Sequence, residues 1–230
     1  MSANLGDAGE PRAGGGSSSG GGGQAALGSD TPSVGGEDAA GDGGQAGGPP
    51  TFVDGCPDLD GDGVSDCTET AVKNSTFDAD VSSWASESGA TIAWNAKDLL
   101  DQAGSGSALV TSTGSIDAAG DSFVAANQCI PVSDGQVVDL VANTYIDAGQ
   151  VTGRASISLW FFPVADCPGD SSPDVFETSA VFATEKVQTL RGRKAVPAGM
   201  LSLRVRLGVI KPFQAETFSV HFDSVLVHAY

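Results

Sequence analysis

The strongest constraint on the fold is a series of short apolar runs that recurs from residue 90 to residue 227. The runs are 90–94, 107–111, 123–125, 137–141, 155–162, 175–182, 186–190, 201–209 and 218–227. Clusters of Gly, Pro, Asp, Ser and Asn separate them, and no segment of similar length has a helical period. Alternation with a period of two places apolar side chains on one face of a strand. We therefore expect an all-β protein, an antiparallel β-sandwich.

The composition divides the chain into three parts. Residues 1–50 contain 17 of the 32 glycines and six acidic residues but few large aliphatic side chains. Such a segment buries too little apolar surface to offset the entropy of ordering its backbone, which costs about 1 to 2 kcal/mol per residue. We predict a disordered Gly/Ser-rich linker over 1–53, a calcium-binding loop over 54–73 and a jelly-roll β-sandwich over 74–230.

The charge excludes several classes of partner. The chain has 29 acidic and 11 basic side chains, which gives a formal net charge of -18. Nucleic-acid binding relies on Lys and Arg, so nucleic acid is a poor ligand for this chain. No apolar stretch reaches the roughly 18 to 20 residues that span a bilayer, and we expect no transmembrane segment.

The most specific motif is a twelve-residue acidic loop. Residues 58–69 read Asp-Leu-Asp-Gly-Asp-Gly-Val-Ser-Asp-Cys-Thr-Glu, which fits the calcium-loop pattern D-x-D-x-D-G-x5-E. Alternate residues of such a loop direct oxygen atoms at a hard cation, so we expect Ca2+ as a cofactor. The expected ligands are the carboxylates of Asp58, Asp60, Asp62 and Asp66, the carbonyl of Val64 and a bidentate Glu69. The alternative is a solvated acidic turn that binds nothing.

The same loop resembles a thrombospondin type 3 repeat, whose D-x-D-x-D-G-x-x-D-x-C pattern is present once, at 58–67. Pro49, Pro50 and Gly55 precede it, so a helix that enters the loop is not expected. Thr68 to Lys73 can form a short helical turn.

Four cysteines allow three pairings, and the sequence does not choose among them. We favour Cys56–Cys67, which closes the calcium loop locally, and Cys129–Cys167, which cross-links two segments of the β domain. A zinc site is not expected, because there is no C-x2-C pair and His221 and His228 are distant in sequence.

The β domain resembles the galactose-binding-like jelly roll, in particular carbohydrate-binding modules of families four, nine and twenty-two. Asn74-Ser75-Thr76-Phe77-Asp78 followed by Trp84 is similar to the opening of that family, and 218–225 is similar to its closing F-x-x-D-D-V strand. Val138 and Ser224 depart from the family pattern, at its usual Tyr and second Asp.

The resemblance implies a polysaccharide or glycan partner, bound by aromatic side chains with polar neighbours. An aromatic ring complements the apolar face of a pyranose, and polar groups complement its hydroxyls. The candidates are Trp94, Tyr145, Trp160 and Phe162, with Asn143 and Arg154. Alternation places Trp160 and Phe162 on one face of their strand and Leu159 and Phe161 on the other. The alternative is that these aromatic residues fill the interior.

The basic residues are also clustered, since seven of the eleven lie between Lys186 and Lys211. Arg204 and Arg206 alternate with Val205 and Leu207, which predicts a solvated polar strand face paired with acidic neighbours. Contact with an acidic polysaccharide is the second interpretation.

Function and location follow from these parts. The two histidines suggest no catalytic triad, so we expect a noncatalytic protein rather than an enzyme. No signal peptide is visible. The cysteines and the glycine-rich tether nevertheless favour a secreted or cell-surface location. Because the tether resembles the spacer of bacterial surface lipoproteins, lipoprotein tethering is one route to that location. The hypothesis is a calcium-binding, carbohydrate-binding surface protein; the alternative is a structural or adhesive module that contacts proteins without a glycan site.

Overall fold

The computed structural model describes residues 51–53, 56–58, 63–87, 89–101, 104–113, 120–169, 174–213 and 215–230, without the side chains of 51–57, 66 and 67. The predicted linker therefore lies almost entirely outside the described residues. The strands are β1 (Thr51–Val53), β2 (Cys56–Asp58), β3 (Ala85–Ser86), β4 (Ala90–Asn95), β5 (Ser107–Ser112), β6 (Asp121–Pro131), β7 (Val137–Tyr145), β8 (Arg154–Phe162), β9 (Asp174–Glu177), β10 (Gln188–Ala195), β11 (Ser202–Pro212) and β12 (Phe218–Ala229). One short helix, α1, spans Asp66–Glu69.

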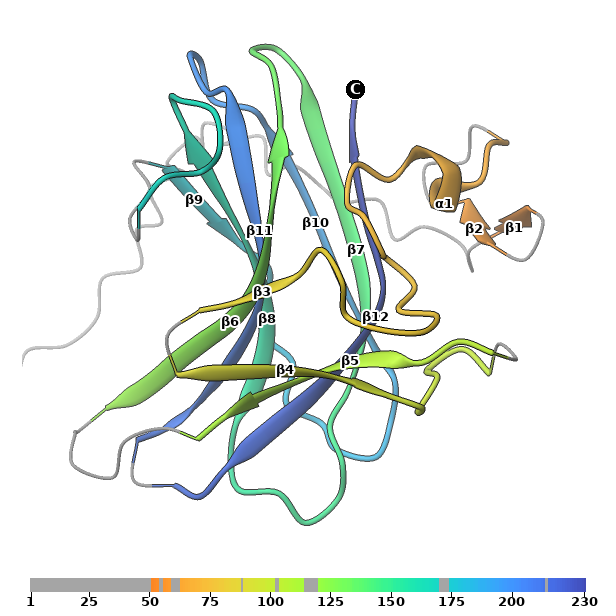
Figure 1. The fold of residues 1–230 in the computed structure, drawn as a ribbon, viewed down its shortest axis with the longest axis vertical. Coiled ribbons are helices and arrows are strands. Elements are labelled where there is room, and N and C mark those ends of the chain that lie inside the picture. Colours follow the sequence, from red (N-terminus) through yellow and green to blue (C-terminus); the bar gives the residue numbers. More distant parts are fainter. Residues whose placement is uncertain are drawn as a thin grey trace, which may run out of the picture. The chain divides into compact units, whose positions relative to one another are not determined.

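Two five-stranded antiparallel sheets form a jelly-roll β-sandwich (Figure 1). One sheet has the order β3-β6-β11-β8-β9, and we call it the β11 sheet after its central strand. The other has the order β10-β7-β12-β5-β4 and is called the β12 sheet. The all-β fold class predicted from the alternating runs is thus confirmed.

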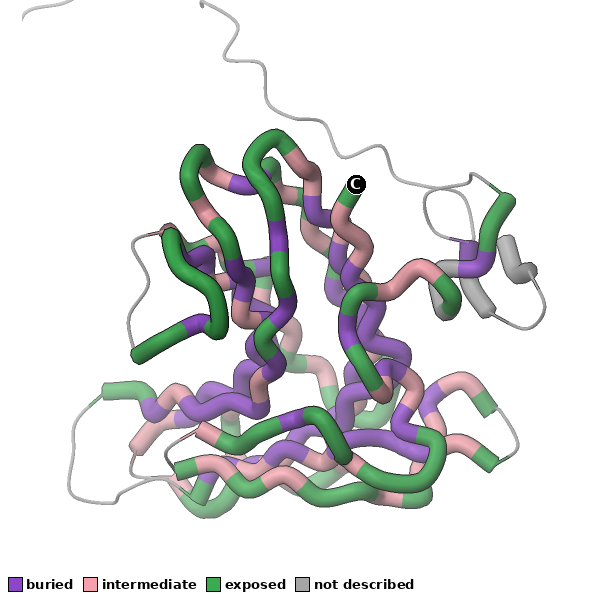
Figure 2. The backbone as a smooth tube through the Cα atoms, turned by 45° about the horizontal axis from the view of Figure 1, so that its top comes forward, coloured by how far each residue is buried: buried purple, intermediate pink, exposed green. Residues whose placement is uncertain are grey.

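The core lies between the inner faces of the two sheets, where the tube in Figure 2 is mostly purple. Burial alternates along β7, as the period-two pattern requires. The β11 sheet contributes Ile157, Leu159 and Phe161 from β8 and a row of Leu and Val residues from β11. The β12 sheet contributes Leu140 and Phe222. Phe77 and Trp84, from the segment similar to the family opening, also join this core.

Each predicted run contains a strand, but several boundaries differ. The run 175–182 is a strand only to Glu177, after which Val181 forms an isolated bridge with Ala155. The run 186–190 begins at Gln188 and continues to Ala195, beyond the apolar residues. Here the pairing with β7 extends the strand through Arg191, Arg193 and Lys194, because backbone hydrogen bonds do not depend on side-chain polarity.

The disulfide expected between Cys129 and Cys167 is present, with an S–S distance of 2.03 Å. Cys56 and Cys67 have side chains outside the described part of the chain, so their pairing stays a prediction. Among the described residues, no helix is long and apolar enough to cross a membrane.

The segment that follows α1 is attached to the last strand. Thr70 Oγ1 accepts a hydrogen bond from Val227 N (3.0 Å), and Ala71 N donates to Val227 O (2.7 Å). Val72 is buried in the core cluster. The last residues of the predicted calcium segment are therefore part of the sandwich.

Candidate functional site

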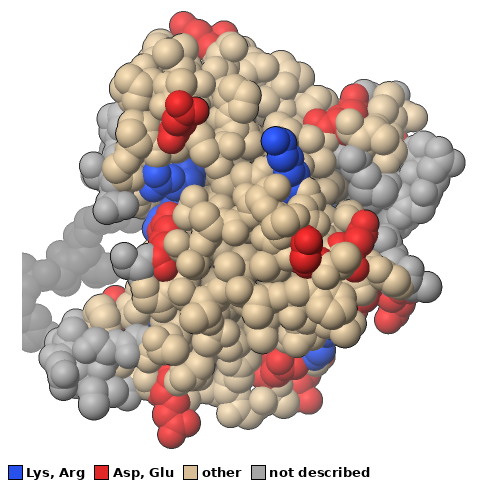
Figure 3. Space-filling view, in the orientation of Figure 1, with Lys and Arg blue, Asp and Glu red and all other residues tan. Residues whose placement is uncertain are grey.

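The outward face of the β11 sheet gathers aromatic and charged side chains. The register aligns Trp160 of β8 with Arg204 of β11 and Cys129 of β6, and it aligns Ser158 with Arg206 and Asn127. Leu159 and Phe161 are fully buried on the inner side, which is the alternation predicted for this strand. Figure 3 shows a small group of basic side chains next to acidic ones near this sheet.

Arg206 is the centre of this cluster. Its guanidinium carbon lies 3.8 Å from the ring centroid of Trp160 and 4.4 Å from that of Phe123. Its Nε donates to Glu87 Oε1 at 2.8 Å, and Nη2 donates to the other carboxylate oxygen. Bidentate pairing and ring stacking use the planar geometry of Arg, which Lys lacks. Only 6% of Arg206 is exposed, so the prediction of a solvated basic strand face is wrong for this residue.

Gly208 makes room for one of these rings. A Cβ atom at position 208 would lie 2.8 Å from Phe123 Cε2. The bare backbone of β11 therefore lets the Phe123 ring lean over the strand toward Arg206.

A second element crosses this face at its other end. Residues 163–169, which we call the strap, leave β8 after Phe162, and Cys167 is bonded to Cys129 of β6. Since β11 lies between β8 and β6, the strap passes over β11. Arg204 donates to Cys167 O and places its guanidinium 5.2 Å from the Phe162 ring centroid. Phe162 is only 2% exposed under this cover.

The six candidate sugar-binding residues do not form one site. Trp160, Phe162 and Arg154 are on β8, whereas Tyr145 and Asn143 are on β7 of the opposite sheet and Trp94 is on its edge strand β4. Among these, Trp160 and Phe162 lie on the aromatic face described above.

The other candidates have local partners. Trp94 is 39% exposed, and its Nε1 donates to Phe77 O at 2.7 Å. Arg154 pairs with Asp121 at 3.0 Å. Asn143 Oδ1 accepts a hydrogen bond from Thr189 Oγ1.

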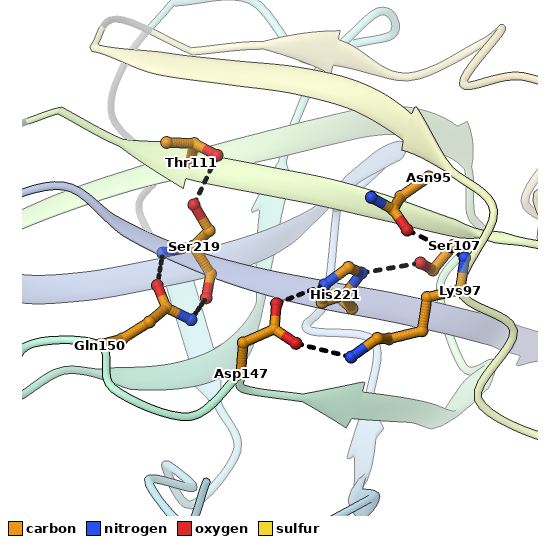
Figure 4. A network of polar contacts seen from close by, with 8 residues as sticks. All are labelled: Asn95, Lys97, Ser107, Thr111, Asp147, Gln150, Ser219 and His221. Atoms are coloured by element: carbon orange, nitrogen blue, oxygen red, sulfur yellow. Dashed lines mark hydrogen bonds and ion pairs between the residues drawn. The ribbon is translucent and has the colours of Figure 1, made fainter. Parts of the chain in front are cut away.

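Tyr145 lies beside a polar network on the outward face of the β12 sheet, and Figure 4 shows the contacts of that network from Lys97 through Asp147 and His221 to Ser107. Lys97 Nζ lies 3.8 Å from the Tyr145 ring centroid and 2.6 Å from Asp147 Oδ1. The other oxygen, Asp147 Oδ2, lies 3.0 Å from His221 Nε2, and His221 Nδ1 lies 3.0 Å from Ser107 Oγ. The network thus connects a lysine, an aspartate, a histidine and a serine from different elements.

The protonation states of this network follow from its partners. Burial lowers the pKa of His221 more than the hydrogen bond to Asp147 raises it. Burial alone would raise the pKa of Asp147, but its bonds to Lys97 and His221 lower it overall. The neutral imidazole therefore donates from Nε2 to the carboxylate and accepts at Nδ1 from the Ser107 hydroxyl.

This Ser–His–Asp arrangement was not predicted from the sequence. Ser107, Asp147 and His221 are far apart along the chain, and only the order β7-β12-β5 brings them together. Such an arrangement activates a nucleophile only where substrate can reach the hydroxyl. Ser107 is completely buried, so its hydroxyl is not accessible to a substrate in this structure.

A buried carboxylate lies on the same strand as His221. Asp223 is 2% exposed, accepts hydrogen bonds from Leu99 N (3.1 Å) and Ser224 N (2.6 Å), and has its pKa raised to about 6 by burial. Its carboxylate fixes the loop after β4 against β12.

The predicted calcium loop is described only in part. Asp60 and Asp62 lie outside the described residues, as does the side chain of Asp66. Asp58 is 7% exposed and accepts a hydrogen bond from Gly63 N at 3.2 Å. Glu69 Oε2 is buried without a hydrogen-bond partner, and Gly63 has a positive φ of 88°. A buried carboxylate oxygen without a donor fits the expected role of Glu69 as a cation ligand.

Comparison with known proteins shows that the fold of this chain is similar to domains of solved structures. No protein-family model and no curated protein matches the chain. The enzymatically active domain of bacteriophage CBA120 tailspike protein 4 matches with a TM-score of 0.51 and 15% identity, over 70% of this chain and 22% of that one. An arabinose-bound GH51 α-L-arabinofuranosidase matches with a TM-score of 0.51 and 12% identity, over 70% of this chain and 26% of that one. The chain thus spans about a quarter of each of these two proteins.

A CBM22-1 xylan-binding domain of Xyn10C from Paenibacillus barcinonensis matches with a TM-score of 0.47 and 14% identity, over 67% of this chain and 90% of that one. The two matches with a TM-score of 0.51, at 15% and 12% identity, show likeness in fold alone.

Proposed function

We propose that this chain is a noncatalytic carbohydrate-binding protein and that the outward face of the β11 sheet is its binding surface. The observation that carries the proposal is the packing of Trp160 and Phe123 around the Arg206–Glu87 pair. Both rings are partly exposed at the surface of a rigid sheet. Aromatic surface next to fixed charged and polar groups suits a sugar ring, which has apolar C–H faces and a rim of hydroxyls.

The polar groups for such hydroxyls lie in the same rows of the sheet. Asn127 and the exposed Glu177 flank the Ser158–Arg206 row. The charges of Arg206 and Glu87 compensate each other, so this face favours a neutral polysaccharide over an acidic one.

The test is a glycan array probed with the full chain, followed by titration of the positive glycans. We expect Trp160→Ala to weaken binding by about tenfold or more, because one stacked ring contributes up to about 1.5 kcal/mol beyond its buried area. Tyr145→Ala is the matched control on the opposite sheet and should bind as the native chain does. Loss of binding in Tyr145→Ala alone would move the site to the β12 sheet.

A structural or adhesive role is the second candidate. It is favoured by the burial of Arg206, whose guanidinium occupies one face of each ring. A folded chain that binds no glycan on the array would support this candidate.

Calcium binding by the loop 58–69 is a separate part of the proposal. It is supported by the partnerless oxygen of Glu69 and by the burial of Asp58. Calorimetric titration of the full chain with CaCl2 should show one site, and extracellular sites of this kind bind at about 0.1 to 1 mM. Glu69→Gln should abolish the heat of binding, while Asp134→Asn, at an exposed turn, should not change it. Equal titrations for the two variants would contradict the site.

We further propose a secreted or surface-tethered location, supported by the Cys129–Cys167 disulfide. Cell fractionation with external protease should degrade the protein on intact cells or recover it from the medium. Recovery only from lysed cells would contradict this location.

A further inference from the structure

The strap is held over the β11 sheet by more than its disulfide. Ser202 Oγ donates to Val164 O at 2.7 Å and accepts from Cys167 N at 3.2 Å. Arg204 donates to Cys167 O. One serine and one arginine on neighbouring outward positions of β11 therefore bind the strap at its start and at its disulfide.

The backbone of the strap is also fixed in an uncommon conformation. Asp166 and Cys167 have φ values of 66° and 45°, in the left-handed region that L side chains rarely adopt. Consecutive residues stay in this region only where surrounding contacts hold them, which here are the disulfide and the bonds to β11.

The consequence is a sharp change in exposure along β8. Phe162 faces outward like Trp160, yet it is 2% exposed, and Ser202, its partner on β11, is 1% exposed. One row away, Trp160 is partly exposed and its partner on β9, Val175, is 49% exposed. The aromatic surface therefore stops at Trp160 because the strap covers the row that continues it.

We propose that the strap determines ligand length: it closes the binding face beyond Trp160, so that the face binds short glycans or chain ends whose last ring abuts the strap. The proposal rests on the proposed carbohydrate binding. It assigns Cys129, Cys167 and Ser202 as specificity-determining residues, which act by holding the strap and not by touching sugar.

The test is a length series of cello-, xylo- and galacto-oligosaccharides, from two rings to about eight, titrated against the full native chain, Cys129→Ser/Cys167→Ser and Ser202→Ala. For the native chain, we expect affinity to stop rising once the rings over Trp160 and Phe123 are filled. In the double variant the strap is released and Phe162 becomes available, so the longest oligosaccharides should bind about three- to tenfold tighter than in the native chain. Disaccharide affinity should stay unchanged.

Ser202→Ala keeps the disulfide and removes the hydroxyl that joins Val164 and Cys167, so it should show the same trend to a smaller extent. The far-ultraviolet spectrum and thermal transition of the double variant show whether it folds. If it does not fold, Ser202→Ala alone tests the role of the strap. Hydrogen exchange at the amide of residue 167 reports release of the strap directly, since Cys167 N donates to Ser202 Oγ in the native chain.

The outcomes separate the two proposals. Identical length dependence in the native chain and in a variant with a released strap would overturn the role of the strap and leave carbohydrate binding intact. Binding by neither chain would overturn both. Binding by the released variant alone would support the strap as the element that closes the face.

Discussion

At the residue scale, the structure shows side chains whose surroundings set their chemistry. His221 and Asp223 lie two residues apart on β12, both almost fully buried, and burial shifts their pKa values in opposite directions, down for His221 and up for Asp223. His221 remains neutral between a donor and an acceptor. Burial disfavours the charged form of the Asp223 carboxyl group. The backbone N–H groups that donate to it offset only part of this cost.

Asp223 should make stability fall as the pH rises. An unfolded Asp titrates at about 3.9, while Asp223 in the folded chain titrates at about 6, so between these values the folded state holds the proton that the unfolded state has lost. The free energy of unfolding should fall across this window by up to about 3 kcal/mol relative to Asp223→Asn. Urea unfolding of both proteins between about pH 4 and pH 7 gives this difference, and parallel pH curves would contradict it.

Ser107 should contribute to stability through His221. Ser107→Ala leaves Nδ1 of a buried imidazole without a donor, which costs about 1 to 3 kcal/mol. Thr111→Val on the same strand removes a partly buried hydroxyl pair with Ser219 and should cost less. Denaturant unfolding compares the two. An ester-hydrolysis assay in which the native chain turns over substrate and Ser107→Ala does not would instead assign Ser107 as a nucleophile.

At the element scale, β12 bends at a bulge. Its register with β7 shifts between Asp223 and Leu226, and Ser224 within the bulge has a φ of 49°. The bulge allows Asp223 to face the loop after β4 while the strand continues with Val225 in the core.

Substitutions at Ser224 should follow backbone strain. Ser224→Gly should be neutral or stabilise by up to about 1 kcal/mol, because Gly adopts the left-handed region without steric cost. Ser224→Val should destabilise by about 1 to 3 kcal/mol, since a β-branched residue is an outlier there. Thermal unfolding measures both. A Val variant as stable as the Gly variant would mean that the strand straightens.

The strands from β4 to β12 were predictable because each carries its own alternation of apolar and polar residues, which also placed Trp160 and Phe162 on one face of β8 without showing which face is outward. The order of the strands within the sheets could not be predicted from the sequence. Pairing such as that of β5 with β12 joins segments about a hundred residues apart, and no local signal marks it. The Arg206–Glu87 pair and the Ser107–His221–Asp147 network depend on that order, and the sequence therefore did not reveal them.

At the scale of the whole molecule, charge is the dominant feature. With a formal net charge of -18, the folded chain carries repulsion that salt screens. The thermal midpoint should rise by a few degrees, roughly 3 to 6, between about 20 mM and 500 mM NaCl.

If calcium binds the loop, about 2 mM CaCl2 should raise the midpoint more than NaCl of equal ionic strength does. Equal shifts of the thermal midpoint in CaCl2 and in NaCl would mean that charge screening accounts for the whole effect.

The order of the strands also constrains how the protein is made. β11 and β12 are the central strands of the two sheets, and they are the last two strands along the chain. On a ribosome, β6 and β8 emerge before the strand that joins them, as do β5 and β7. Neither sheet can close until residues 202–229 have left the exit tunnel, so the sandwich folds only after all of its strands have been made. Until then β6 and β8 stay unjoined in one sheet, and β5 and β7 stay unjoined in the other.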